Sequence, residues 1–154
     1  MAKEIERKFL IDLEKIGPLE DGTAIRQGYI ATADKTVVRV RLAGERAYLT
    51  LKGENVGVTR TEFEYEIPAD DAQEIITVLC NGPVVEKTRY LIVNAGHTWE
   101  VDIFHGDNDG LVVAEIELSS EDEAFELPHW ATKEVSGDVS YYNSSLLENP
   151  FKNW

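Results

Sequence analysis

Strand-like segments dominate this chain, and the alternation of residues with a period of two in several of them constrains the fold more than any other sequence feature. A period of two places successive side chains on opposite faces of a β-strand. In the first segment, for example, Glu4, Glu6 and Lys8 share one face. The pattern therefore predicts eight strands, at residues 3–11, 24–32, 36–43, 47–53, 59–67, 84–92, 98–104 and 111–118.

Short, turn-like links such as Ala33-Asp34 and Asn94-Ala95-Gly96 join most of these segments. A parallel return would need a crossover of a dozen or more residues, so the short links favour antiparallel neighbours. Gly28, inside the second segment, is a candidate β-bulge.

Three other segments carry helix signals. Pro68 opens an amphipathic stretch that ends at Asn81, before Gly and Pro. Ser120 and Glu123 have the spacing of a capping box, which predicts a short helix that stops before the next proline. Residues 139–149 are expected to form a last short helix.

Charged residues share a strand face, two positions apart, in six of the eight predicted strands. One such pair is typical of a solvated sheet face, but six sets in one sheet indicate a common environment. Long sheets usually curl or close, and the apolar faces need cover, so the charged faces would meet inside. We therefore predict a mainly β (α+β) fold for a single domain over residues 1–154. It is an eight-stranded antiparallel β-barrel tunnel with a charged lumen, flanked by a few helices.

Basic side chains would be crowded together in that lumen. Clustered cations in a low-dielectric enclosure repel one another. An anion with many oxygens would relieve this repulsion, and guanidinium groups suit phosphate oxygens well. The seven basic residues are Lys8, Arg39, Arg41, Lys52, Arg60, Lys87 and Arg89.

Carboxylates share the same predicted faces, with neither Cys nor His beside them. Such hard oxygen ligands suit Mg²⁺ or Mn²⁺ and not zinc. Basic residues for phosphate and carboxylates for a divalent cation describe a polyphosphate site. The alternative is that opposite charges only neutralise one another across the barrel. The candidate metal ligands are Glu4, Glu6, Glu115 and Glu117, with Glu62, Glu64 and Asp102 as weaker candidates.

The overall charge excludes other kinds of partner. Lys and Arg number 15 against 29 Asp and Glu, which gives a net charge of −14. This charge argues against binding to nucleic-acid phosphates or to anionic membranes. Charged residues at positions 3–8 stand where a signal peptide needs an apolar region, and the single cysteine, Cys80, excludes an internal disulfide. We therefore expect a cytoplasmic protein.

The charged pairs also occur, in order, as the motifs of a known family. They are Glu4-x-Glu6-x-Lys8, Arg39-x-Arg41, Leu51-Lys52, Arg60-x-Glu62-x-Glu64, Glu86-Lys87-Thr88-Arg89-Tyr90, Glu100-x-Asp102 and Glu115-x-Glu117. On these motifs the chain resembles the CYTH domain, or triphosphate tunnel metalloenzyme, family over residues 3 to about 147. It looks most like the small bacterial inorganic tripolyphosphatases.

The resemblance implies metal-dependent hydrolysis of a triphosphate, foremost inorganic tripolyphosphate to pyrophosphate and phosphate. The seven basic residues would bind the phosphates, and the glutamates would bind the metal. The expected partner is a small-molecule triphosphate, not nucleic acid or a membrane, and a homodimer is left open. Alternatives are a class IV-type adenylate cyclase, a thiamine triphosphatase, or a non-catalytic module that binds polyphosphate or nucleotide.

The resemblance also implies a catalytic lysine–tyrosine pair, matched by Lys87 and Tyr29, with Glu4 as a further catalytic residue. A neighbouring ammonium stabilises a phenolate, which makes Tyr29 a candidate acid–base group. Arg26 and Tyr29 lie on opposite faces of a regular strand unless Gly28 forms a bulge. Of the two, we favour Tyr29 for the lumen.

The C-terminal stretch departs from the family pattern. The family often has a basic residue just before a Tyr-x-Asn element, but here Asp138-Val139-Ser140 precedes Tyr141-Tyr142-Asn143. In the family this basic residue contributes to phosphate binding or to plugging one end of the tunnel. We therefore do not expect that contribution in this chain.

Overall fold

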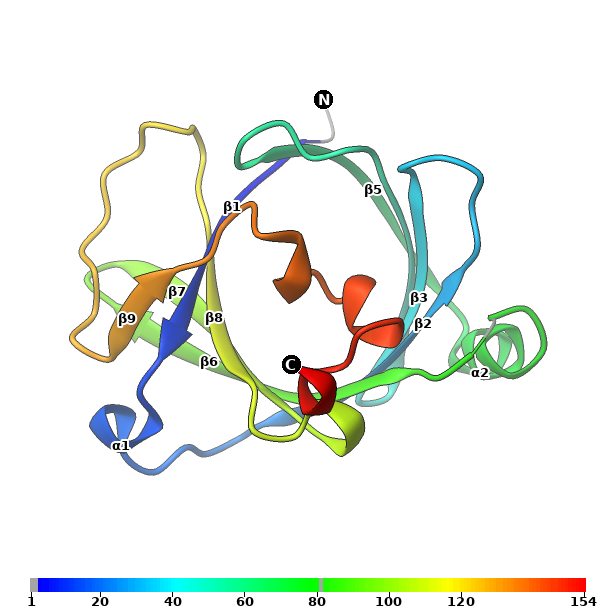
Figure 1. Cartoon of the computed structure of the whole chain (residues 1–154), viewed down its shortest axis with the longest axis horizontal. Coiled ribbons are helices and arrows are strands. Elements are labelled where there is room, and N and C mark those ends of the chain that lie inside the picture. Colours follow the sequence, from blue (N-terminus) through cyan, green and yellow to red (C-terminus); the bar gives the residue numbers. More distant parts are fainter. Residues whose placement is uncertain (1–2, 81) are drawn as a thin grey trace.

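Eight antiparallel strands close into one barrel, as the sequence predicts (Figure 1). The structure is a computed structural model that describes residues 3–80 and 82–154. Around the barrel the strand order is β1-β5-β4-β3-β2-β6-β7-β8, and β8 pairs again with β1. The strands are β1 Lys3–Ile11, β2 Thr23–Ile30, β3 Val37–Ala43, β4 Arg46–Lys52, β5 Thr59–Ile67, β6 Val85–Asn94, β7 His97–Phe104 and β8 Val112–Glu117.

One further strand, β9 (Ala131–Glu134), pairs with β1 outside the barrel. β1 divides one edge between two partners, because its first residues pair with β5 and its last residues pair with β9. The sequence analysis missed β9, since four residues are too few to establish an alternating pattern.

The helices are few and short. Among the described residues they are α1 Leu13–Ile16, α2 Ala69–Val78 and the 3₁₀ turns η1 Gly106–Asn108, η2 Val139–Tyr141, η3 Ser145–Leu147 and η4 Phe151–Asn153. α2 confirms the helix expected after Pro68, although the expected end at Asn81 lies outside the described residues. Of the helices that the structure describes, none has both the length and the apolar character to cross a membrane.

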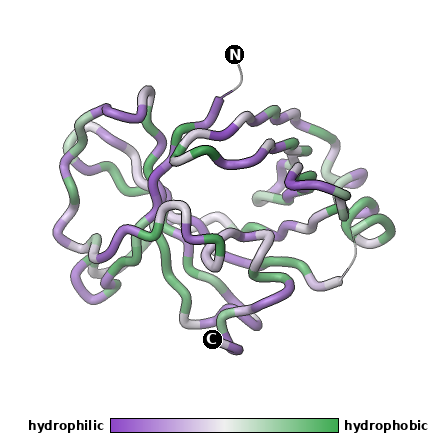
Figure 2. The backbone as a smooth tube through the Cα atoms, turned by 45° about the horizontal axis from the view of Figure 1, so that its top comes forward, coloured by the Kyte–Doolittle hydropathy of each residue, from purple (hydrophilic) through white to green (hydrophobic). Residues whose placement is uncertain are grey.

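Apolar side chains cover the outside of the barrel in two places, and hydrophobic and hydrophilic residues alternate along the strands (Figure 2). On one side, Phe9 and Trp99 pack beneath the 118–131 segment, which contributes Trp130. On the other side, α2 packs on β3 and β4 through Ile76 and Val40. With its apolar residues turned outward, the sheet leaves its charged residues to the inside.

Gly28 does not form a bulge, which corrects the expectation from the sequence. β2 keeps an unbroken register with β3 from Ile25 to Ile30. A Cβ at Gly28 would lie 2.9 Å from Sγ of Cys80, just beyond α2. The glycine therefore permits the close approach of the helix region to the outside of the barrel.

The helix predicted from Ser120 is wrong. Residues 119–122 form bends and a turn, and the chain to Pro128 is irregular. Glu123 accepts a hydrogen bond from the amide of Ser119, one residue before the expected cap, and its other oxygen lies 2.7 Å from Nε2 of His97. That contact, together with the packing of Phe125 against Trp99, favours an irregular path.

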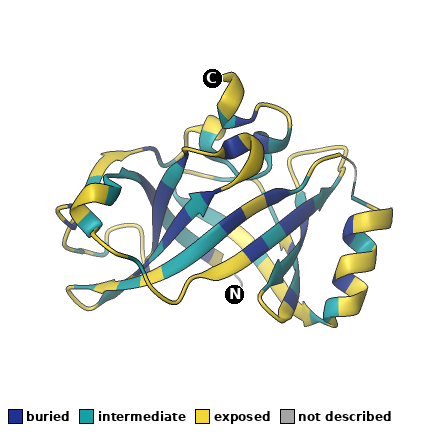
Figure 3. Cartoon of the chain, turned by 90° about the horizontal axis from the view of Figure 1, so that it is seen from below, coloured by how far each residue is buried: buried dark blue, intermediate teal, exposed yellow. Residues whose placement is uncertain are grey.

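The helix predicted at 139–149 is likewise replaced by the two short turns η2 and η3. Tyr142 between them has an extended backbone, and its hydroxyl accepts a hydrogen bond from Asn55. Figure 3 shows this C-terminal segment at one end of the barrel. There Leu146 is buried against Val85, Phe104 and Val113, so an apolar cluster holds the C-terminal segment on the barrel.

Candidate active site

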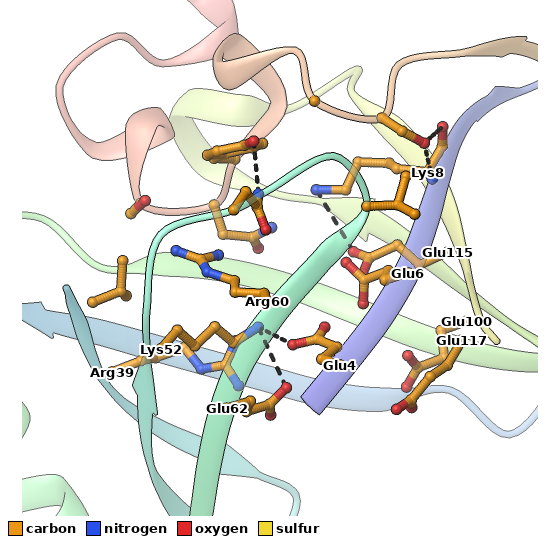
Figure 4. Close-up of a pocket in the computed structure, with 18 of the residues that line it drawn as sticks. Glu4, Glu6, Lys8, Arg39, Lys52, Arg60, Glu62, Glu100, Glu115 and Glu117 are labelled. Atoms are coloured by element: carbon orange, nitrogen blue, oxygen red, sulfur yellow. Dashed lines mark hydrogen bonds and ion pairs between the residues drawn. The ribbon is translucent and has the colours of Figure 1, made fainter. Parts of the chain in front are cut away.

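The charged faces of the strands surround a cavity of about 490 Å³ (Figure 4). All seven of the predicted basic residues line it, as do six of the seven predicted carboxylates. Asp102 is the exception, because it lies fully buried behind the lining. Strand alternation places these side chains on the inner face, and closure of the barrel brings them together.

Glu6, Glu100 and Glu115, from β1, β7 and β8, form a cluster whose nearest oxygens all lie within 4.8 Å of one another. Burial raises the pKa of Glu6 well above its ordinary value, and the charge of Glu115 adds to this effect. Burial also opposes the ionisation of Glu115, but Lys8 and the hydrogen bond with Glu6 hold the pKa of Glu115 well below its usual range. The two carboxylates thus oppose each other's ionisation, and a divalent cation bound between them would offset that repulsion.

A second carboxylate pair, Glu4 and Glu62, lies around Lys52 (Figure 4). Nζ of Lys52 is 3.0 Å from Glu4 and 4.0 Å from Glu62. Burial and the hydrogen bond with Glu4 raise the pKa of Glu62 to about 8. Burial opposes the ionisation of Glu4, but its hydrogen bond with Glu62 and the charge of Lys52 lower the pKa of Glu4 to about 2. Glu117 also lines this part of the lumen.

Asp102 is the counter-ion of two basic residues. One oxygen lies 2.8 Å from Nζ of Lys87 and the other lies 2.8 Å from Nε of Arg89. Burial lowers the pKa of Lys87 to about 7 in spite of Asp102, and Arg89 and Arg41 contribute to the lowering. Because two cations already occupy its oxygens, Asp102 is a poor candidate for a metal ligand.

Three arginines retain donors that no carboxylate takes up within the described residues. Nε of Arg39 is buried without a partner, although its Nη2 lies 3.5 Å from Glu64. Arg41 donates through Nε to Gln27, and Arg60 donates through Nε to the Gly53 carbonyl. Their remaining N–H groups face a lumen in which an anion with several oxygens would satisfy them.

Tyr29 faces the lumen without any bulge, because it pairs directly with Arg39 on the inner face. Its hydroxyl accepts a hydrogen bond of 2.8 Å from Gln27. Arg26 lies on the outer face, with its Nε 3.8 Å from Glu86. Of the two residues, it is therefore Tyr29 that faces the lumen, as we expected from the sequence.

Three residues of the site had no role assigned from the sequence: Glu100, Gln27 and Asn143. Glu100 belongs to the motif Glu100-x-Asp102, two positions from Asp102 on a charged face, and that position was the signal for a role in the lumen. Asn143, in the C-terminal segment, accepts hydrogen bonds from Lys87 and Gln27. Asp138, Val139 and Ser140, which replace the family's basic residue, are exposed and do not line the lumen.

Comparison with known proteins gives consistent matches over nearly the full length. Residues 2–146 match the family model described as the CYTH domain. An inorganic triphosphatase from Acetivibrio thermocellus is 49% identical over 154 residues, which is 100% of this chain and 99% of that protein. An inorganic triphosphatase from Nitrosomonas europaea is 38% identical over 147 residues, covering 93% of this chain and 95% of that protein.

Solved structures agree with the barrel. The crystal structure of an inorganic triphosphatase has a TM-score of 0.67 at 36% identity, and the match covers 96% of this chain and 95% of that one. A Hippeastrum protein, proposed as an adenylyl cyclase and described as having a dominant triphosphatase activity, has a TM-score of 0.61 at 16% identity. That match covers 76% of this chain and 80% of the other, and it supports the fold alone.

Proposed function

The chain belongs to the CYTH domain family, and from that membership we propose that it is a metal-dependent triphosphatase that hydrolyses inorganic tripolyphosphate to pyrophosphate and phosphate. The relatives that are 49% and 38% identical are named inorganic triphosphatases. The observation that carries the proposal is the lumen itself, in which arginines with free donors face a cluster of three glutamates.

The charge inside the lumen supports the need for a metal ion. Eight basic side chains, Lys3 included, share the site with eight carboxylates, Asp102 and Glu100 included, so the site has no excess of positive charge. A highly charged tripolyphosphate would meet as much repulsion as attraction there. Divalent cations bound to the glutamates would reverse this balance, which is why we propose binding of substrate and metal together.

Glu6, Glu100 and Glu115 are the residues that we propose to hold the ion. Three carboxylates from three strands form an all-oxygen donor set that fits Mg²⁺ or Mn²⁺, and we propose Mg²⁺. Glu4, Glu62 and Glu117 are nearby carboxylates able to bind it through water or to hold a second ion. When bound, such an ion supplies charge stabilisation for the departing pyrophosphate.

The remaining roles belong to side chains of the lumen. We propose that Arg39, Arg41 and Arg60 bind the phosphate oxygens with their free N–H groups, aided by Lys8, Lys52, Lys87 and Arg89. Glu4, held by Lys52, would orient a water molecule for in-line attack on a terminal phosphorus. Tyr29 would give its proton to the pyrophosphate that leaves.

A product assay tests this function. The protein is incubated with tripolyphosphate, ATP or thiamine triphosphate, each with Mg²⁺ or with EDTA, and phosphate, pyrophosphate and cyclic AMP are measured. We expect equal amounts of phosphate and pyrophosphate from tripolyphosphate, with Mg²⁺ and not with EDTA. Cyclic AMP from ATP would instead identify a cyclase, faster release of phosphate from thiamine triphosphate would identify a thiamine triphosphatase, and binding without any turnover would refute an enzymatic function.

A further inference from the structure

We propose that Gln27 is a positioning residue that directs the hydroxyl proton of Tyr29 into the lumen. This inference rests on the proposed function, in which Tyr29 donates a proton. Gln27 lies on β2 two positions before Tyr29 and is fully buried, with 0% of its surface exposed. It does not line the lumen, but all three side chains to which it bonds do: Tyr29, Arg41 and Asn143.

Every hydrogen atom of the Gln27 amide has a partner. Its Nε2 donates to the Tyr29 hydroxyl at 2.8 Å and to Oδ1 of Asn143 at 3.1 Å. Its Oε1 accepts from Nε of Arg41 at 2.9 Å. The amide thus joins a phosphate-binding candidate, a catalytic candidate and the C-terminal segment at one buried point.

Two cations determine which way the amides point. Arg41 can only donate hydrogen bonds, so the group of Gln27 that faces it must be the carbonyl oxygen. The –NH₂ group of Gln27 is then necessarily turned to Tyr29. Lys87 likewise donates to Asn143 at 2.9 Å, so Asn143 also presents its oxygen and accepts from Gln27.

This arrangement decides how Tyr29 can act. The tyrosine oxygen accepts from Gln27, so its single proton is not needed for that bond and is available to a group in the lumen. After the proton has left, the same N–H would stabilise the phenolate. If the amide were reversed, the hydroxyl would donate to Gln27 and its proton would point away from the substrate.

The matched variants separate this role from a purely structural one. Gln27→Glu keeps an oxygen for Arg41 but replaces the donor to Tyr29 by an acceptor. Gln27→Met keeps the approximate volume and removes all three bonds. Asn108→Leu is the control, because Asn108 is another buried amide that bonds to the Phe151 N–H outside the lumen.

We expect Gln27→Glu to lower kcat for tripolyphosphate by about 10- to 100-fold, a fraction of a full acid–base contribution. KM should change by less than about threefold, because the bond to Arg41 persists. Gln27→Met should lower kcat similarly and also raise KM, since Arg41 loses its partner. Asn108→Leu should lower the melting temperature while kcat stays within about twofold of the unmodified protein.

The decisive measurement repeats Gln27→Glu and Gln27→Met in a Tyr29→Phe background. If Gln27 acts through Tyr29, neither substitution should lower kcat there by more than about twofold. The same loss in both backgrounds would overturn the inference, as would unchanged kcat for the folded Gln27 variants or for Tyr29→Phe. Each of these results leaves the function standing, whereas absence of turnover in the unmodified protein would refute the function itself.

Discussion

Burial and the nearest charged neighbour determine in which direction the pKa of each carboxyl group in the lumen is shifted. Glu6 and Glu115 stand close together on adjacent strands, yet their pKa values move in opposite directions. The difference arises because Glu115 has Lys8 at 3.8 Å, whereas Glu6 has mainly other carboxylates around it. A group that is costly to ionise alone becomes a good ligand when a divalent cation replaces the proton.

Removing one oxygen donor tests this cluster. We expect Glu115→Gln to weaken Mn²⁺ binding on the order of 100-fold, since the loss of even a supporting partner of a metal ligand costs 10- to 100-fold. Titration calorimetry with Mn²⁺ would measure this change, and metal-dependent turnover should fall with it. Glu86→Gln on the outer face is the matched control, and equal Mn²⁺ affinity in both variants would exclude Glu115 as a ligand.

Gly28→Ala tests the close contact between β2 and the end of α2. The added methyl would lie 2.9 Å from Sγ of Cys80, and overpacking of this kind costs about 1–3 kcal/mol of unfolding free energy. Urea unfolding would measure the loss, and adding Cys80→Ala should restore part of it. Gly53→Ala, where the nearest atom is 3.5 Å away, should leave stability nearly unchanged; equal stability of both variants would contradict the argument.

At the scale of elements, β1 holds the molecule together because it contacts three strands. It pairs with β8 along one edge, and with β5 and β9 in succession along the other. Arg7 on its outer face donates two hydrogen bonds to Glu134 of β9, at 2.8 and 2.6 Å. The ion pair helps to hold β9 against β1, because few backbone hydrogen bonds join these two strands.

The Arg7–Glu134 pair predicts a pH-dependent contribution to stability. The guanidinium of Arg7 lowers the pKa of Glu134, so the contribution is present above the unfolded value of about 4.3 and is lost as the pH falls through the folded value. Because both side chains are about one third exposed, Glu134→Gln should cost less than about 1 kcal/mol at pH 7.

Urea unfolding of Glu134→Gln and the unmodified protein between pH 7 and pH 3 measures this contribution. The difference in unfolding free energy should narrow as the pH falls below about 4.3. Glu126→Gln, an exposed glutamate on the neighbouring segment, is the control. A difference that stays constant with pH would mean that the effect of Glu134→Gln does not come from the charge pair.

The whole molecule carries a net charge of −14, yet eight of its 15 basic residues line one cavity. The C-terminal segment packs at one end of the barrel and contributes Tyr142, Asn143 and Ser144 to the lining of that cavity. A ligand bound inside would contact several strands at once and would oppose their separation.

We therefore expect tripolyphosphate supplied with Mg²⁺ to stabilise the fold of the Tyr29→Phe variant, in which slow turnover should leave the ligand intact, and to stabilise it much less in EDTA. At about 100 times its dissociation constant, the ligand should add roughly 2.7 kcal/mol to the unfolding free energy. Thermal unfolding at increasing tripolyphosphate concentrations would show the effect, with NaCl at matched ionic strength as the control. A melting temperature that responds equally to both would contradict binding in the lumen.

Strand alternation was sufficient to predict much of this molecule. It indicated the eight barrel strands and the inner face of each strand, because a period of two depends only on local backbone geometry, and the short links between the strands indicated the antiparallel pairing. The basic residues of the lumen followed directly from that face assignment. The predicted catalytic and metal-binding roles of these residues remain predictions that the variants above test.

Only the tertiary structure shows which charged side chains of the lumen lie in contact with one another. Glu100 joins Glu6 and Glu115, while Asp102 is taken up by Lys87 and Arg89, and nothing local distinguishes these two acids of β7. The same holds for Gln27, whose partners come from β3 and from a segment 116 residues away. The sequence by itself determined the faces of the strands; barrel closure set the distances between them, because those depend on register and on contacts between residues remote in the chain.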